Sequence, residues 1–242
     1  MPVPRKTIAT VTAIHDLDQG VYLLTLQVPR AFTRFKAGQF THLTIDAYNP
    51  QDGFWPESRV FSLASEPGGE EIRIVYSVKG RYTSKMRDTL KVGEQCWLKL
   101  PYGSFIIDDA AEGSRPLILV AGGTGIAPYI PYLMQRAKGS SARETHLFYG
   151  IRDPSLLVFE EELNNVTQLT PDLSIHLYSE LTAGDDRFRP GRIRMEDILA
   201  AAAARSNPIY YLSGPPAMIG LFKERLLEAE VPRDDIRIDE WE

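Results

Sequence analysis

The chain has 242 residues, enough for two ordinary domains of roughly 100 to 140 residues each. Its formal net charge of -5 disfavours nucleic acid as the main partner, because proteins that bind nucleic acid are usually basic. The single cysteine, Cys96, excludes an intramolecular disulfide and an iron–sulfur cluster held by four cysteines of this chain.

At the start of the chain, residues Met1–Lys6 include basic side chains but no apolar run follows them, so they do not form a secretory signal. No stretch approaches the roughly 18 consecutive apolar residues that a membrane-spanning helix needs. The richest apolar run, Leu117–Ala121, has the length of a buried strand. We therefore expect no membrane span and a cytoplasmic location.

The first half of the sequence predicts strands. From Lys6 to Asp108, short runs rich in β-branched and aromatic residues are separated by glycine-containing turns, a pattern typical of an antiparallel barrel. One helix is expected at about Thr83–Leu90, capped by Thr83 or Ser84. The six expected strands are Ile8–Ile14, Val21–Val28, Gln39–Ile45, Val60–Ala64, Ile72–Val78 and Gln95–Leu100.

The second half alternates strands with helices from about Arg115 onward. This alternation indicates βαβ units on a parallel sheet, an architecture that binds dinucleotides. We place the boundary within the polar segment Asp109–Ser114, giving domains of residues 1–110 and 111–242. The expected strands are Leu117–Ala121, Thr145–Gly150, Leu173–Tyr178 and Ile209–Leu212, with a last strand at the chain end. The first expected helix follows the glycine-rich turn and ends near Lys138. Three more helices are expected at Ser155–Leu163, Met195–Arg205 and Ala217–Ala229.

A glycine-rich turn, Gly122–Gly125, directly follows the strand Leu117–Ala121. Glycines let the backbone approach a pyrophosphate closely, and a helix N-terminus offers unpaired N–H groups with partial positive charge. Thr124 adds a hydroxyl donor. A tight turn without any ligand would need similar glycines, but ligands of open sheets bind after the first strand. The spacing matches neither the GxGxxG nor the Walker pattern.

A second motif, Arg59-Val60-Phe61-Ser62, lies in an expected strand, where Arg59 and Phe61 share one face. Arginine can bind phosphate through two donors, phenylalanine has a flat apolar ring, and serine can form hydrogen bonds. A half-buried strand with an arginine at its edge would give the same pattern. The segment Gly80–Thr83, a glycine before a helix start, is a second place that can hold phosphate.

These motifs resemble those of the ferredoxin–NADP reductase superfamily, in the same order and over nearly the whole chain. The resemblance implies an FAD-binding barrel in residues 1–110 and an NAD(P)-binding α/β domain in residues 111–242. It also implies an enzyme that takes hydride from NAD(P)H onto bound FAD. The matching segments are Arg59–Ser62, Gly80–Thr83, Pro101–Phe105, Gly122–Pro128, Tyr149–Arg152, Gly191–Ile193 and Ser213–Met218.

The resemblance implies a role for each matching residue. Arg59 and Thr83 would hold the FAD pyrophosphate, and Phe61 would stack on the isoalloxazine. Ser62 would form a hydrogen bond at N5, the flavin nitrogen that receives the hydride. The other residues implied at FAD are Val60, Val75, Tyr76, Ser77, Gly80, Tyr82 and Ser84. Those implied at the nicotinamide dinucleotide are Gly122, Gly123, Thr124, Gly125, Ile126, Pro128, Tyr149, Gly150, Arg152, Ser179, Glu180, Gly214, Pro215, Pro216 and Met218.

The candidate catalytic residues by resemblance are Ser62, Ser213 and Glu240. Trp241 is implied to cover the flavin ring, although an aromatic anchor for the last strand would look the same. Ser213 stands where the family motif usually has Cys. Compared with that Cys, the serine keeps the size and polarity of the side chain but loses the polarisability of sulfur. At the position of Phe61 the family motif often has Tyr, whose hydroxyl Phe61 lacks. Flavin reductases that release their flavin also have Phe at this position of the motif.

Glu180 follows the third strand of the second domain. A carboxylate there accepts a hydrogen bond from a ribose 2′-hydroxyl and repels a 2′-phosphate, which favours NADH over NADPH. Arg152, Arg187 and Arg189 could compensate. Because the chain cannot hold a four-cysteine cluster, we expect a separate electron acceptor: a ferredoxin, a flavodoxin or an oxygenase component.

Two alternatives remain open at this point. One is an NAD(P)H:flavin reductase that releases reduced flavin, although the Gly80–Thr83 motif favours bound FAD. The other is a nucleotide-binding module without catalysis. No metal site is expected, since the four histidines have no spacing suited to zinc.

Overall fold

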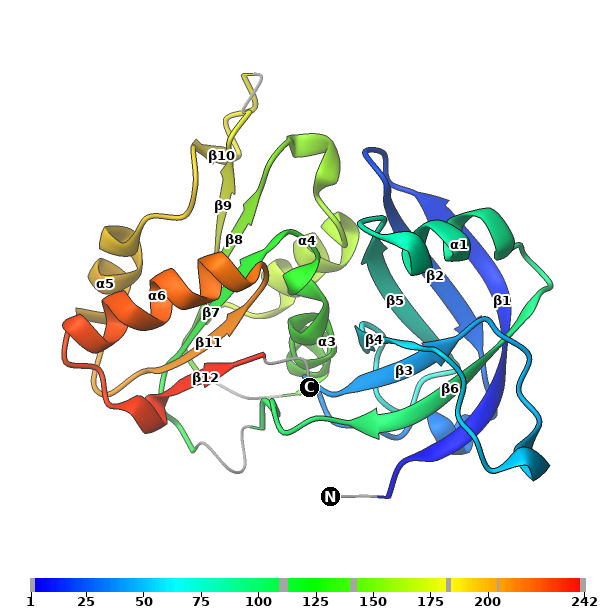
Figure 1. The fold of residues 1–242 in the computed structure, drawn as a ribbon. Helices are drawn as coiled ribbons and strands as arrows, with labels where there is room; N and C mark the ends of the chain where they lie inside the picture. The colour runs from blue at the N-terminus through cyan, green and yellow to red at the C-terminus, as the bar shows by residue number, and fades with distance from the viewer. Residues whose placement is uncertain (1–2, 109–112, 140–142, 182–183, 204, 240–242) are drawn as a thin grey trace.

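The computed structural model describes residues 3–108, 113–139, 143–181, 184–203 and 205–239. The chain forms an antiparallel sheet curved into a nearly closed barrel, followed by a parallel sheet with helices on both faces (Figure 1). The predicted fold class is therefore confirmed. Over the described ranges, none of the helices combines the length and the apolar character needed to cross a bilayer.

The barrel contains six strands in the order β4-β3-β6-β1-β2-β5, with every neighbouring pair antiparallel. Its edge strands β4 and β5 contact each other, and the Ala64 N–H donates to the Arg73 carbonyl at 2.9 Å, which nearly closes the sheet. The elements are β1 (Arg5–Asp16), β2 (Val21–Gln27), η1 (Arg30–Phe32), β3 (Phe40–Thr44), η2 (Pro50–Asp52), β4 (Arg59–Ser62), β5 (Glu71–Ser77) and β6 (Gln95–Tyr102).

One helix, α1 (Arg81–Thr89), lies outside the barrel, and Gly80 is its N-cap residue. The prediction that Thr83 or Ser84 caps this helix was wrong. The Thr83 hydroxyl instead accepts hydrogen bonds from the N–H groups of Lys79 at 3.0 Å and Gly80 at 3.2 Å, one turn before it. Since a side chain at the third helical position can satisfy these donors, the helix begins two residues earlier than expected.

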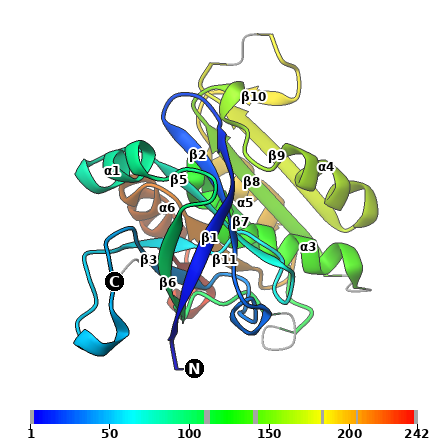
Figure 2. The ribbon, with the colours of Figure 1, turned by 90° about the vertical axis from the view of Figure 1, so that its right-hand side faces the viewer.

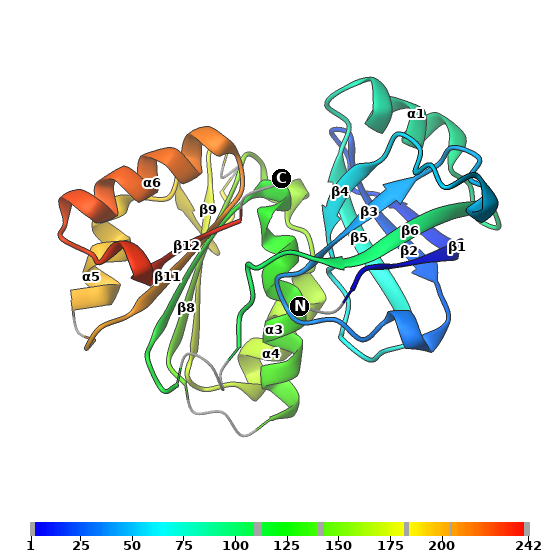
Figure 3. The same ribbon diagram turned by 60° about the horizontal axis from the view of Figure 1, so that its bottom comes forward.

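The second sheet has the strand order β10-β9-β8-β7-β11-β12, and all of its neighbouring strands are parallel. Helices α3 and α4 cover the face toward the barrel, and α5 and α6 cover the other face (Figures 1 and 3). The strands are β7 (Leu117–Gly122), β8 (Thr145–Ile151), β9 (Leu173–Ser179), β10 (Phe188–Pro190), β11 (Ile209–Ser213) and β12 (Ile236–Ile238). The helices are η3 (Gly123–Tyr129), α3 (Ile130–Lys138), η4 (Pro154–Leu156), α4 (Glu160–Leu169), α5 (Met195–Ala203), α6 (Pro216–Glu228) and η5 (Arg233–Asp235).

Two expected helices begin differently in the structure. The glycine turn after β7 continues as the 3-10 helix η3, and the α-helix α3 begins only at Ile130. The helix expected over Ser155–Leu163 is a 3-10 turn followed by α4, because Phe159 has a φ of 62° and interrupts the helical backbone. The three-residue strand β10 was not expected from the sequence.

The barrel and the second sheet are joined by a shared apolar cluster. Val75 of β5 belongs to the same cluster as Ile126 and Tyr129 of η3, and β5 contacts η3. Arg73 and Glu162 form an ion pair across the same interface. Seen from the barrel side, α1 lies at one margin of the molecule and α3 and α4 lie at the other (Figure 2). The boundary at residue 110 lies between β6 and β7, among residues that are not described, and stays a prediction.

Candidate active site

Arg59, at the start of β4, lies beside the beginning of α1. Its guanidinium carbon is 4.6 Å from the centre of the Tyr82 ring, and Nη2 is 2.7 Å from Glu57 Oε1. The Tyr82 hydroxyl is fixed by the Ile45 N–H, which donates to it at 3.0 Å, and burial raises the pKa of Tyr82. Arg59 is therefore held near the helix start while its side chain stays 45% exposed, so it is available to an anion.

The start of α1 offers further hydrogen-bond donors. The first N–H groups of an α-helix have no partner within the helix, and they carry partial positive charge. A Cβ on Gly80 would meet nothing within 4 Å, so there is open space beside the N-cap residue of this helix. The Ser84 N–H is not one of these unpartnered groups, because it donates to the Gly80 carbonyl at 2.9 Å. Together with Arg59, this helix start can bind a diphosphate.

The aromatic residues predicted at the flavin lie mostly inside the barrel. Phe61 is 8% exposed and Tyr76 is 3% exposed, with their ring centres 6.0 Å apart. Ser62 is 4% exposed, while Val60 and Ser77 are half-buried. The burial of Phe61 and Tyr76 is explained by packing in the barrel core. Contact of these residues with a cofactor stays a prediction.

The glycine turn after β7 packs tightly against the loop after β11. A Cβ on Gly125 would lie 2.5 Å from the Ser213 carbonyl oxygen, and one on Gly122 would lie 2.7 Å from Met218 Sδ. Gly214 has a φ of 146°, and a Cβ there would lie 2.9 Å from the Gly122 nitrogen. In this structure, these three glycines let two loops of the protein approach each other. That packing requirement is separate from any ligand.

Gly123 differs from its neighbours in the same turn. It has a φ of 54°, and a Cβ there would meet nothing within 4 Å. Gly123 and Thr124 are half-buried, whereas Ile126 and Pro128 are buried in the core. Within the turn, the first two positions of η3 are therefore the ones accessible to a dinucleotide.

Ser213, the last residue of β11, is fully buried and donates a hydrogen bond to Asp239 Oδ2 at 2.8 Å. Asp239 is 3% exposed and follows β12 directly. Burial raises the pKa of Asp239 to about 6, partly offset by the Ser213 hydrogen bond. No sequence motif pointed to Asp239. Glu240 and Trp241, which the resemblance did identify, lie outside the described residues.

The remaining candidates on the second sheet form a group at the ends of β8 and β9. The Ser179 hydroxyl is 3.3 Å from the Arg152 carbonyl, and the Glu180 carboxylate pairs with Arg192 Nε at 3.1 Å. Glu180 and Arg152 are exposed. A Cβ on Gly150 would lie 3.0 Å from Ile193 Cγ1. Tyr149 is fully buried, and burial raises its pKa. Pro215 and Pro216 are exposed at the start of α6.

Among the described residues, no group of three or more His, Cys, Asp or Glu side chains is arranged to hold a metal ion. His146 and His176 do meet, with Nδ1 and Nε2 3.1 Å apart and their rings stacked. His176 also stacks on Phe148, with ring centres 4.5 Å apart. The pair therefore belongs to the packing between β8 and β9.

Comparison with known proteins gives matches over both parts of the chain. Residues 119–224 match the family model described as an oxidoreductase NAD-binding domain. The chain is 29% identical over 250 residues to the reductase component of propane 2-monooxygenase from Rhodococcus jostii (strain RHA1), covering 99% of this chain and 65% of that protein. Among solved structures, the cytochrome P450 reductase GcoB of Amycolatopsis aligns with a TM-score of 0.82 at 21% identity, covering 98% of this chain and 70% of that one. The cytochrome b5 reductase domain of Ulva prolifera nitrate reductase aligns with a TM-score of 0.75 at 18% identity, covering 97% of each chain.

These matches agree with the two-sheet fold. Residues 119–224 match a family of NAD-binding oxidoreductase domains, and the chain as a whole shares the fold of the two solved reductases. The resemblance inferred from the sequence motifs is therefore confirmed. The chain spans 65% of the length of the Rhodococcus relative, so that relative contains a further segment without a counterpart here.

One residue departs from the motif that carries the resemblance. Where that motif usually has Cys, this chain has Ser213, whose hydroxyl donates a hydrogen bond to Asp239. A thiol is a much weaker hydrogen-bond donor than a hydroxyl. The substitution therefore adds a buried connection between the end of β11 and the residue after β12.

Proposed function

We propose that the protein is a flavin-dependent reductase, which transfers hydride from NADH or NADPH to bound FAD and passes single electrons to a separate acceptor. The observation that carries this proposal is the contact between β5 of the barrel and η3, the glycine turn of the second sheet. The open helix start of α1 follows β5 directly, and Gly123 is the first residue of η3. A flavin held at the first element and a dinucleotide held at the second would meet at this contact.

The residues at α1 suit the diphosphate of FAD. Arg59 supplies an exposed guanidinium, and the space in front of Gly80 admits phosphate oxygens. Bound FAD supplies the chemistry itself, which is to accept a hydride and release electrons one at a time. The role of the protein is to hold FAD and to place Ser62 beside the flavin nitrogen that receives the hydride.

The residues at Gly123, Thr124 and Glu180 suit a nicotinamide dinucleotide. The positive φ of Gly123 and the space beside it leave room for a pyrophosphate. The exposed carboxylate of Glu180 repels a 2′-phosphate, which favours NADH. Arg192 Nε lies 3.1 Å from Glu180 in an exposed ion pair, which weakens this preference without reversing the charge of the carboxylate.

Ser213 and Asp239 act as positioning residues in this proposal. Because the Ser213 hydroxyl is engaged by Asp239, it fixes the loop Gly214–Pro216 on which the nicotinamide would rest. Ser62 would donate a hydrogen bond to the flavin nitrogen that receives hydride. We keep Glu240 in the proposal as a candidate catalytic residue next to the flavin. Trp241 would cover the flavin ring, as the resemblance implies.

A separate electron acceptor completes the proposed function. The Rhodococcus relative is the reductase component of a monooxygenase, and a solved relative is a cytochrome P450 reductase. With Cys96 as its single cysteine, this chain cannot hold a four-cysteine cluster of its own. We propose a ferredoxin, a flavodoxin or an oxygenase component as the acceptor, and a cytoplasmic location that cell fractionation would check.

The visible spectrum of the purified protein tests the proposal. We expect flavin bands that remain with the protein through repeated ultrafiltration, and release of FAD on denaturation. A protein that washes free of flavin but catalyses reduction of added riboflavin would support the flavin reductase alternative. A protein that shows no flavin bands even after incubation with FAD would contradict both readings.

A further inference from the structure

A cavity of about 270 Å³ lies beside β12, the edge strand of the second sheet. Its lining comes from α6, from the segment before and within β12, and from the loop after β6: Lys223, Leu227, Arg233, Ile236, Arg237, Ile238, Ser104 and Phe105. Of the three basic residues, Arg237 donates to the Asp234 carbonyl. The cavity follows β12 along its length, from Ile236, which pairs with Tyr210, to Ile238, which pairs with Leu212. Its basic residues Lys223 and Arg233 are not among those assigned to the cofactor sites proposed above.

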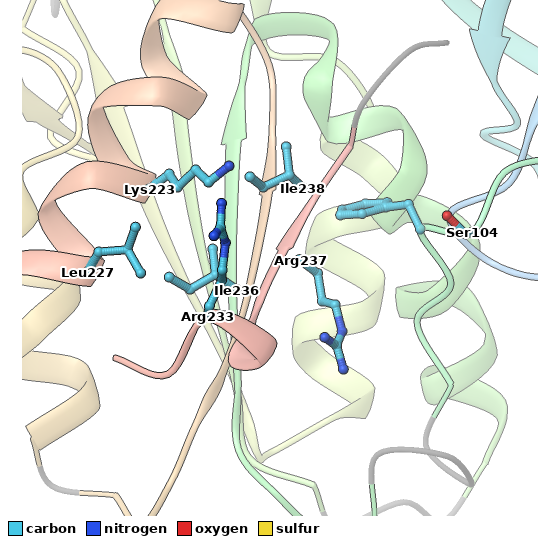
Figure 4. A pocket seen from close by; sticks show the side chains of 8 residues that line it. Ser104, Lys223, Leu227, Arg233, Ile236, Arg237 and Ile238 are labelled. Carbon is cyan, nitrogen blue, oxygen red and sulfur yellow. The ribbon is translucent and has the colours of Figure 1, made fainter. Parts of the chain in front are cut away.

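Two basic side chains point into this cavity from different elements. Figure 4 shows Lys223 and Arg233 directed toward one another, with the apolar residues around them. Within the described ranges, neither side chain forms a hydrogen bond or an ion pair. By contrast, Arg225 on the same helix pairs with Glu228 at 3.0 Å. Two adjacent positive charges repel each other unless an anion lies between them.

The composition of the chain makes this unpaired arrangement informative. The sequence has 32 acidic and 27 basic residues, so carboxylates are in excess. Lys223 is half-buried and Arg233 is exposed, and both share the cavity lining with the apolar side chains of Leu227 and Ile236, which lower the local polarity. An ionic contact is stronger in such surroundings than in open water. The cavity therefore favours an anionic ligand over water alone.

We propose that this cavity binds a small phosphate dianion, either inorganic phosphate or a phosphate monoester, between Lys223 and Arg233. The arginine fork matches two phosphate oxygens, and the lysine supplies a point charge to a third. At about 270 Å³, the cavity lies just below the range of roughly 300–1,000 Å³ typical of larger organic ligands. Its size therefore suits a phosphate group with few attached carbon atoms.

The test is a titration of the full-length, ¹⁵N-labelled protein with sodium phosphate, at ionic strength matched with sodium chloride. We expect saturable shifts of the backbone amides of Lys223, Arg233 and Ile236–Ile238. Lys223→Gln and Arg233→Gln should each weaken binding roughly tenfold, because each removes a charge-assisted hydrogen bond. Arg225→Gln, on the same helix but outside the cavity, should leave the affinity unchanged.

The outcomes separate this site from the proposed cofactor sites. Unchanged affinity in the double variant Lys223→Gln/Arg233→Gln would overturn the proposal, as would shifts confined to residues 80–81 and 123–124. Tighter binding of glycerol 3-phosphate than of phosphate would support the site and identify an organic phosphate as its ligand. Equal binding would support the site and identify free phosphate. The double variant should still be reduced by NADH, so failure of this proposal leaves the proposed function untouched.

Discussion

The hydroxyl of Ser213 and the carboxylate of Asp239 are joined by a 2.8 Å hydrogen bond that is buried at the ends of two neighbouring parallel strands. Both side chains are almost inaccessible, with exposed fractions of 0% and 3%. Burying a carboxylate costs free energy unless it is protonated or fully paired. The stability of the second sheet should therefore depend on the protonation of Asp239.

Replacement of Asp239 by asparagine should change how stability depends on pH. The pKa of Asp239 is raised from 3.8 to about 6, so the folded state binds this proton more tightly than the unfolded state. The stability that this proton provides is fully present below about pH 4 and is lost as the pH rises through about 6. Two pKa units correspond to about 3 kcal/mol.

Asp239→Asn cannot ionise but keeps an acceptor for Ser213. Urea unfolding at about pH 4 and pH 8 should show the wild type losing up to about 3 kcal/mol relative to this variant between the two values. Other titrating groups cancel in the comparison. A constant difference between the two proteins at both pH values would contradict the burial of an ionisable Asp239.

Gly125→Ala should destabilise the fold. The added Cβ would lie 2.5 Å from the Ser213 carbonyl oxygen and 2.6 Å from the Gly214 Cα, and both are backbone atoms that cannot rotate away. Overpacking of this kind costs about 1–3 kcal/mol. Gly220→Ala is the matched control, because a Cβ in α6 meets nothing within 4 Å and alanine favours a helix by about 1 kcal/mol. In urea unfolding, Gly125→Ala should lower the free energy of unfolding and Gly220→Ala should raise it. Equal changes in the two variants would show that the two loops are not in close contact.

Arg59→Gln should weaken FAD binding roughly tenfold or more, because a charge-assisted hydrogen bond to phosphate is lost. Its present ion pair with Glu57 is exposed and contributes at most about 1 kcal/mol, so thermal stability without flavin should hardly change. Arg87→Gln serves as the control, since Arg87 pairs with Asp88 at 2.7 Å near the other end of α1. Flavin fluorescence titration measures both. Equal FAD affinity in the two variants would remove Arg59 from the proposed site.

Ser62→Ala should still bind flavin but be reduced by NADH roughly tenfold more slowly, because the hydrogen bond at the reacting nitrogen is lost. Ser65→Ala is a close control, since Ser65 is also buried and its hydroxyl has no hydrogen-bond partner in the described residues. Rapid mixing under anaerobic conditions measures both rates. An unchanged rate in Ser62→Ala would show that this hydroxyl has no part in the transfer.

Local sequence patterns were sufficient to predict most of the fold. The continuous apolar run Leu117–Ala121 predicted a buried parallel strand, and β7 is buried at every residue. The start of α4 could not be predicted, because the positive φ of Phe159 is unusual for an aromatic residue and has no local signal. The short strand β10 forms only by pairing with β9, a contact that no local pattern reports.

Contiguous motifs supplied candidate site residues, whereas a residue that depends on a distant contact was missed. Gly80 and Thr83 were named from a contiguous motif and its resemblance to the family motif, and both lie at the start of α1. Asp239 was missed because it lies in a polar chain end with several carboxylates, and only the pairing of β12 with β11 brings it to Ser213. The same pairing cannot be inferred from composition or periodicity.

In the proposed function, hydride passes from NADH to a flavin held beside the glycine turn. The most direct measurement is anaerobic rapid mixing of the flavin-bound protein with NADH and, separately, with NADPH. We expect the flavin bands to bleach with saturable kinetics, and faster with NADH than with NADPH. Flavin bands that neither nucleotide bleaches would contradict it.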